Sequence, residues 1–125
     1  MPFPERRKYP RVFESVPCEL AVGPSSWVTQ AKNLSCGGVL CLLSVALPLM
    51  TKLEVTLRLP KVGQGGVPEA IRCIGVVVRQ EPDPTPGASP SFQTAIYFSD
   101  LEQEDRRRIA EFVLQSMLSH DRRRS

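Results

Sequence analysis

Three arginines near the start of the chain are the first residues whose type and spacing suggest a chemical role. Arg7 and Arg11 form an R-x-x-x-R motif, and Arg6 stands directly before it. Pro10 disfavours a helix here, because proline lacks a backbone N–H and pushes the preceding residue towards extended geometry. We therefore expect the arginines on a loop, where they can surround an anion. A solvated, unstructured terminus is the alternative interpretation.

A second group of residues, Asn33, Ser35 and Gly38, forms an N-x-S-x-x-G motif. Asn and Ser offer compact hydrogen-bonding groups in a turn, and glycine permits positive φ or a close approach of the backbone to a ligand. The motif predicts a turn between a strand and an apolar segment, with polar groups that can hold a ligand. A tight turn without a ligand is the alternative, and each motif taken alone favours its structural interpretation.

The positive charge of the chain lies at its beginning. The formal net charge is +3, and basic residues outnumber acidic ones only between Met1 and Arg11. We expect residues 1–11 to form a basic, mobile segment of a single domain covering residues 1–119, and residues 120–125 to form a basic, disordered tail. Since the rest of the chain is neutral and has few aromatic residues, we do not expect a nucleic acid partner.

The cysteines and the single histidine argue against a metal site and against catalysis. The four cysteines lack C-x-x-C spacing, and His120 lies close to the end of the chain. We therefore expect no zinc site, and we expect the thiols to be buried and reduced. The sequence contains no G-x-S-x-G or H-E-x-x-H motif, so we expect neither enzyme activity nor a cofactor.

Alternating apolar residues predict strands through most of the chain. The clearest is Lys52–Leu59, where apolar side chains on one face alternate with charged and polar ones on the other. The other predicted strands cover residues 16–22, 27–32, 39–43, 71–80 and 92–98. Segments rich in glycine and proline, residues 60–69 and 81–91, predict exposed hairpin loops.

A change of period after Phe98 predicts one terminal helix. Ser99 and Asp100 offer an N-cap, and Glu102 follows Ser99 at the spacing of a capping box. One stripe of the helix is expected to dock on the sheet, with Leu114 off it; the stripe comprises Ile109, Phe112, Val113, Ser116 and Met117. The elements together predict an all-β fold with a terminal helix, either a small, mainly antiparallel barrel or a sandwich.

Two segments bear on where the protein resides. Residues 33–51 carry no charge, but their apolar run, residues 39–50, is shorter than the roughly 20 residues of a spanning helix. We therefore expect a buried core segment and no membrane span. The first residues lack the apolar region of a signal peptide, so we expect a cytoplasmic location.

In this order, the two motifs resemble the PilZ domain, the bacterial receptor module for cyclic di-GMP. The family pattern is R-x-x-x-R, then [D/N]-x-S-x-x-G, followed by strands and a C-terminal helix. No position of either motif departs from this pattern, and the resemblance runs from Glu5 to about Leu118. It implies a six-stranded antiparallel β-barrel with one C-terminal α-helix, a cytoplasmic location and no catalytic activity.

The resemblance implies that cyclic di-GMP is the ligand of both motifs. A guanidinium group can pair with phosphate oxygens or with O6 and N7 of guanine, and can stack on the base. We assign Arg7 and Arg11 to phosphate and guanine contacts, and Arg6 to a further guanine contact. Asn33 and Ser35 are expected to form hydrogen bonds with a guanine edge.

Two further residues complete the predicted site. Gly38 is expected to keep the turn open beneath the ligand. Arg79 follows an apolar run and is a weaker candidate at the edge of the site, where an ordinary exposed strand arginine is an equal alternative.

The resemblance predicts a receptor and adaptor for the second messenger. The dianionic ligand is expected to order the N-terminal arginine loop and thereby to couple cyclic di-GMP to a protein partner of unknown identity. The alternative is a PilZ-fold protein-interaction module that binds no nucleotide.

Overall fold

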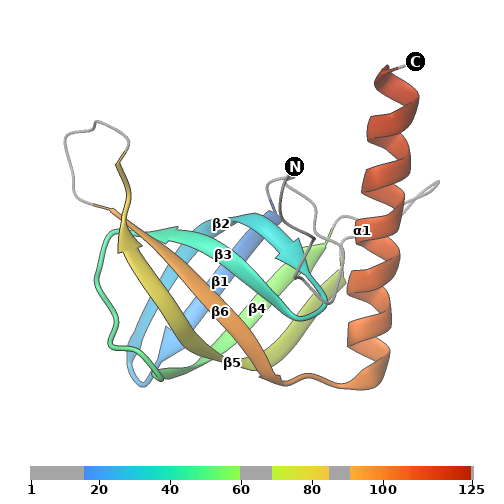
Figure 1. Cartoon of the computed structure of the whole chain (residues 1–125). Helices are drawn as coiled ribbons and strands as arrows, with labels where there is room; N and C mark the ends of the chain where they lie inside the picture. Colours follow the sequence, from blue (N-terminus) through green and yellow to red (C-terminus); the bar gives the residue numbers. More distant parts are fainter. Residues whose placement is uncertain (1–15, 60–68, 85–90, 125) are drawn as a thin grey trace.

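The computed structural model describes residues 16–59, 69–84 and 91–124, with side chains as far as Leu118. Six strands form a closed barrel and one helix stands beside it (Figure 1). The elements are β1 (Val16–Val22), β2 (Ser25–Ser35), β3 (Gly38–Leu43), β4 (Lys52–Leu59), β5 (Glu69–Pro82), β6 (Phe92–Asp100) and α1 (Gln103–Arg124).

Closure of the sheet decides between the two predicted architectures. The strand order is β1-β2-β3-β6-β5-β4, and β1 pairs with both β2 and β4. All pairs are antiparallel; for example, Cys18 lies opposite Thr29 on one side and Leu57 on the other. The prediction of a six-stranded antiparallel barrel with a C-terminal helix is therefore confirmed.

The apolar side chains at alternate positions of the strands fill the barrel interior. On β4, Leu53, Val55, Leu57 and Leu59 are buried, and the charged residues between them are exposed. Removing such apolar side chains from water is the main stabilising contribution to a small domain. The four cysteines are buried and reduced, as expected.

Several strands extend beyond the apolar segments that predict them. The turn predicted from the motif is present at Cys36 and Gly37, but β2 continues to Ser35, so Asn33 and Ser35 lie on the strand and not in the turn. β5 includes Glu69 and runs to Pro82, which corrects the predicted loop bounds. Backbone hydrogen bonds continue the ladder whatever the polarity of the side chains. Of the other predicted loop residues, 60–68 and 85–90 lie outside the described residues.

The predicted N-cap of the helix is wrong. Ser99 and Asp100 are the last residues of β6, and the Ser99 hydroxyl donates to the carbonyl of Ile74 at 3.4 Å. The backbone N–H of Arg106 donates to the carbonyl of Glu102 at 2.9 Å, which places the cap at Glu102. Pairing with β5 thus extends the strand through the residues that local propensity assigns to the helix start.

Helix α1 packs on the barrel with its first half. Ile109, Phe112, Val113 and Ser116 are buried and Leu114 is exposed, as predicted. Met117 is 41% exposed, because the C-terminal half of α1 extends beyond the barrel (Figure 1). The backbone of α1 is helical through Arg124.

Within the described part of the chain, no helix has both the length and the apolar character needed to cross a membrane.

The buried thiols predict a loss of stability at high pH. Burial, with a smaller contribution from nearby Cys18, raises the pKa of Cys73 from 9.0 to about 12. Between these values the folded chain holds a proton that the unfolded chain releases, so the free energy of unfolding falls as the pH rises. Urea unfolding at pH 8 and pH 10.5 measures this fall, which should be shallower in Cys73→Ala. An equal fall in both proteins would contradict the assignment.

Candidate functional site

The hairpin between β2 and β3 brings the second motif together at one corner of the barrel. Ser35 lies opposite Gly38, with Cys36 and Gly37 in the turn. The Ser35 hydroxyl oxygen accepts a hydrogen bond from the Gly37 N–H at 3.1 Å. The Gly37 carbonyl accepts one from the Phe98 N–H at 3.0 Å. These bonds tie the turn to itself and to the neighbouring strand β6.

A β-bulge on β2 decides where Asn33 points. Ala31 pairs with Cys41 and Asn33 pairs with Leu40, so Lys32 is an extra residue. Without the bulge, Asn33 would fall on the same inner face as the fully buried Ala31. The extra residue instead turns Asn33 outward and leaves Leu34 in the core.

Asn33 carries an unpaired polar atom at this position. Its side chain is half-buried, and its Oδ1 is buried without a hydrogen-bond partner among the described residues. Since almost all buried polar atoms of folded proteins have a partner, such an exception needs an explanation. An acceptor without a donor is suited to the N–H groups of a ligand.

Ser35 and Gly38 have structural roles that the unpaired Asn33 oxygen lacks. Ser35 is only 2% exposed, and its oxygen already accepts the turn bond. A Cβ at Gly38 would overlap the carbonyl oxygen of Ile96 on β6. Glycine is therefore required here for close packing of β3 on β6.

A second bulge places Arg79 on the same outer face. Val77 pairs with Ile96 and Arg79 pairs with Ala95, so Val78 is the extra residue on β5. Val77 is buried in the core, and without the bulge Arg79 would also point inward. Both Val78 and Arg79 are exposed.

The two bulges define one outward row across four strands. Asn33 pairs with Leu40, Leu40 with Ala95, and Ala95 with Arg79. We call these four residues the outer row. Along the curved sheet, three strand spacings, or about 14 Å, separate its ends, which lie on opposite sides of the closed six-stranded barrel. Leu40 and Ala95 are half-buried, so an apolar surface lies between an amide and a guanidinium group.

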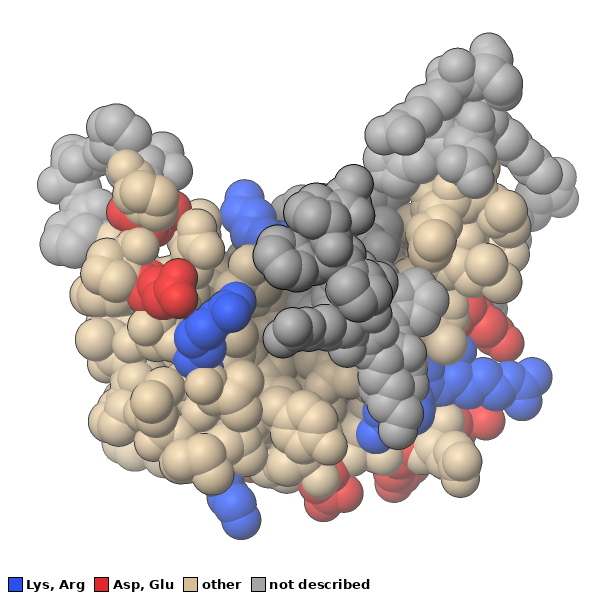
Figure 2. All heavy atoms as spheres, viewed as in Figure 1, with Lys and Arg blue, Asp and Glu red and all other residues tan. Residues whose placement is uncertain are grey.

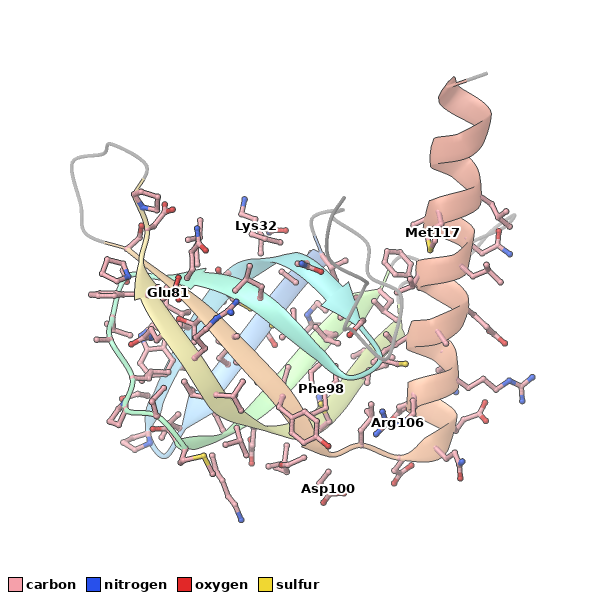
Figure 3. All side chains as sticks on the ribbon, viewed as in Figure 1. Lys32, Glu81, Phe98, Asp100, Arg106 and Met117 are labelled. Atoms are coloured by element: carbon pink, nitrogen blue, oxygen red, sulfur yellow. The ribbon has the colours of Figure 1, made fainter. Side chains whose placement is uncertain are left out.

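Charged side chains are sparse near the outer row. Figure 2 shows broad uncharged areas on the face formed by β5 and β6, with an acidic and a basic side chain next to each other at its left. Lys32, at the β2 bulge, is exposed beside the row, and Figure 3 shows it at the rim of the barrel. The row therefore offers apolar surface with Lys32 near one end and Arg79, halfway round the barrel, at the other.

Helix α1 is tied to the same hairpin. Nη1 of Arg106 donates to the carbonyl of Cys36 at 2.7 Å. Figure 3 shows Arg106 in the first part of α1, pointing towards the barrel. A charged donor in a partly buried position makes a stronger hydrogen bond than a neutral one. The helix is thus fixed to the turn that carries the motif.

The predicted site is brought together only in part. The outer row joins Asn33 to Arg79, and the hairpin places Ser35 and Gly38 beside Asn33. Arg6, Arg7 and Arg11 lie outside the described residues. A groove of about 730 Å³ lies elsewhere, lined by residues of β1, β4, β5 and β6, and none of the predicted site residues lines it.

Sequence reasoning missed the apolar middle of the outer row. Leu40 and Ala95 belong to strands that alternation predicts, but neither has a distinctive residue type. Lys32 was missed as well. Leu40 and Ala95 lie between Asn33 and Arg79 only because of the register of the two bulged strands. No single segment of the sequence contains that information.

Comparison with known families identifies one match. The sequence model described as the PilZ domain matches residues 5–115. No curated protein matches the chain.

Several solved structures share the fold. The inhibitor of motility MotI/DgrA of Bacillus subtilis is 21% identical with a TM-score of 0.78, over 92% of this chain and 53% of that one. The PilZ domain with c-di-GMP of YcgR from Escherichia coli is 14% identical with a TM-score of 0.71, over 95% and 97%. The MrkH–c-di-GMP complex of K. pneumonia is 18% identical with a TM-score of 0.71, over 95% and 56%. The chain thus spans about half the length of MotI and of MrkH.

The link between α1 and the hairpin predicts unequal effects of two neighbouring arginines. Arg106→Ala should lower the free energy of unfolding by about 1.5–3 kcal/mol, because a charge-assisted hydrogen bond is lost. Arg107→Ala should change it by less than about 0.5 kcal/mol, since Arg107 is 71% exposed and, among the described residues, pairs only with Glu104 and Glu111. Urea unfolding measures both values. Equal losses would show that the Cys36 contact is unimportant.

Proposed function

Because the chain belongs to the PilZ domain family, we propose that it binds cyclic di-GMP over the outer row of the barrel. The observation that carries this proposal is the buried, unpaired Oδ1 of Asn33. Guanine presents N–H donors on its Watson–Crick edge, and a carbonyl-type oxygen is their natural acceptor. The YcgR and MrkH structures with c-di-GMP support the choice of ligand.

The rest of the outer row fits the remainder of a guanine nucleotide. Leu40 and Ala95 offer half-buried apolar surface against which a base can lie. Arg79, at the far end of the row, can pair with a phosphate or with O6 and N7 of guanine. Its exposure leaves the guanidinium group accessible to a ligand.

The arginines of the first motif supply the remaining contacts in this proposal. Arg7 and Arg11 pair with phosphate and guanine, and Arg6 adds a guanine contact. Ser35 acts mainly by holding the turn that positions Asn33, since its oxygen is already bonded and its side chain is buried.

Ligand binding then acts as a signal. The dianionic ligand joins the arginine segment to the hairpin of β2 and β3, and the ordered segment changes the surface that a protein partner meets. In this proposal the chain is a cytoplasmic adaptor without catalytic activity or cofactor. A PilZ-fold interaction module that binds no nucleotide is the second candidate, and the first experiment below distinguishes the two.

Calorimetric titration tests the receptor function. Cyclic di-GMP should bind saturably and GTP should not, and Asn33→Ala and Arg7→Ala should each weaken binding at least tenfold, which corresponds to about 1.4 kcal/mol. Asn33→Ala should not lower the free energy of unfolding, because the unpaired oxygen makes no bond that the substitution removes. Arg58→Ala, whose guanidinium group pairs with Glu19 at 3.1 Å, is the control. Absence of binding at high protein concentration would favour the second candidate.

A pair of variants on one strand tests the extent of the site. Arg79→Ala should weaken cyclic di-GMP binding about three- to tenfold, because it removes the cation at the end of the outer row. Arg72→Ala should leave the affinity unchanged, since Arg72 is exposed on β5 but pairs with Thr56 on the β4 side of the barrel. Calorimetry measures both. Equal effects would exclude Arg79 from the site.

A further inference from the structure

Apolar side chains are exposed on the barrel next to the outer row. Leu49 and Met50, in the connection between β3 and β4, are 62% and 72% exposed. Val78 on β5 and Tyr97 on β6 are 49% and 55% exposed. We call these four residues the Met50 patch. The proposed function gives these four side chains no contact with the ligand, so it does not account for their exposure.

Strand register and backbone hydrogen bonds relate Met50, Val78 and Tyr97 of the patch to one another through β5. Lys52 pairs with Val76, and Val76 pairs with Tyr97. The connection continues the ladder, because the Met50 N–H donates to the Val77 carbonyl at 2.7 Å and the Val77 N–H donates to the Thr51 carbonyl at 3.0 Å. Met50 is therefore hydrogen-bonded to the residue before Val78, and Val78 directly precedes Arg79 of the outer row.

The backbone holds Met50 in an unfavourable conformation. Its φ is 70°, and it is the only non-glycine residue with positive φ among those described. The Thr51 N–H donates to the Pro48 carbonyl at 3.3 Å, which closes a turn with Met50 in its third position. Glycine or asparagine ordinarily takes that position. The connection is also fixed from inside the barrel, where the Leu47 N–H donates to Oε1 of Gln80 at 2.9 Å.

The charges around the patch indicate what can cover it. Lys52 and Arg79 flank the patch, are exposed, and form no ion pair with any described residue. An apolar surface between two unpaired cations is complementary to a segment that carries apolar and acidic side chains.

Two other occupants fit these charges less well. In a symmetric contact between two copies, the cations of one copy would lie close to those of the other, because the same patch faces itself. An anionic membrane would also meet the carboxylates that border the patch: Glu54 and Asp100 pair with Ile74 beyond Lys52, and Glu81 lies two residues after Arg79 on β5. A narrow segment avoids these carboxylates.

We propose that the Met50 patch docks a short acidic segment of a protein partner, with its apolar side chains on Met50 and Val78 and its carboxylates near Lys52 and Arg79. The assignment of this patch to the output of the adaptor rests on the proposed function. Because Arg79 belongs to both surfaces, a bound dinucleotide and the docked segment influence each other.

Selection from a random 15-residue peptide library on the immobilised full chain tests the proposal. Enriched peptides should combine Asp or Glu with Leu, Ile or Phe. In fluorescence anisotropy the best synthetic peptide should bind Met50→Asn at least tenfold more weakly than the unaltered chain. Lys52→Gln should weaken binding and reduce its salt dependence. Asparagine tolerates positive φ, so the melting temperature of Met50→Asn should not fall.

Controls separate this proposal from its alternatives. Val28→Thr alters an apolar residue that is 77% exposed on β2, and it should bind the peptide like the unaltered chain. The proposal is overturned if the enriched peptides lack acidic residues, or if Met50→Asn binds the peptide as well as the unaltered chain does. It is also overturned if the chain binds phosphatidylglycerol vesicles and Met50→Asn abolishes that binding, or if the chain forms a dimer that Met50→Asn dissociates. Ligand binding is measured separately: Met50→Asn should bind cyclic di-GMP with the same affinity as the unaltered chain. A failure of ligand binding in both proteins contradicts the receptor function and leaves the peptide result standing.

Discussion

Closure of the barrel is the constraint on which the rest of this structure depends. Every strand pairs on both sides, so an extra residue in one strand cannot be absorbed at an open edge. It must bulge, and the residue that follows it changes face. The bulges at Lys32 and Val78 do this on β2 and β5. Each turns a polar side chain outward, and the strands between them align these side chains in one row.

Alternation and loop composition were sufficient to predict all six strands and the helix, because the hydrophobic period reports directly on burial. The faces of Asn33 and Arg79 were not predictable in the same way. Simple alternation assigns Asn33 to the inner face with Ala31, and Arg79 to the inner face with Val77. An extra residue leaves no trace in composition, so only the paired register reveals it. The prediction of the helix cap was wrong for a related reason, because pairing of β6 with β5 outweighed the local preference of Ser99 and Asp100 for a helix start.

The N-x-S-x-x-G motif combines two different physical roles. Ser35 closes the turn and Gly38 permits close packing on Ile96, so both serve the fold. Asn33 alone has a buried polar atom that the described fold leaves unpaired. A chain can therefore keep the serine and glycine for structural reasons after losing a ligand. The residue at position 33 is the more informative one for binding, and it stands in the motif only because the bulge before it turns it outward.

The contact between Arg106 and Cys36 has a consequence for how related sequences diverge. The acceptor is a main-chain carbonyl, which every amino acid provides. Substitution at position 36 therefore leaves the acceptor in place, whereas substitution at position 106 removes the donor. Related sequences should show no covariation between the two positions, although the two residues are in contact. The attachment of α1 to the hairpin would then be invisible to any method that infers contacts from correlated substitutions.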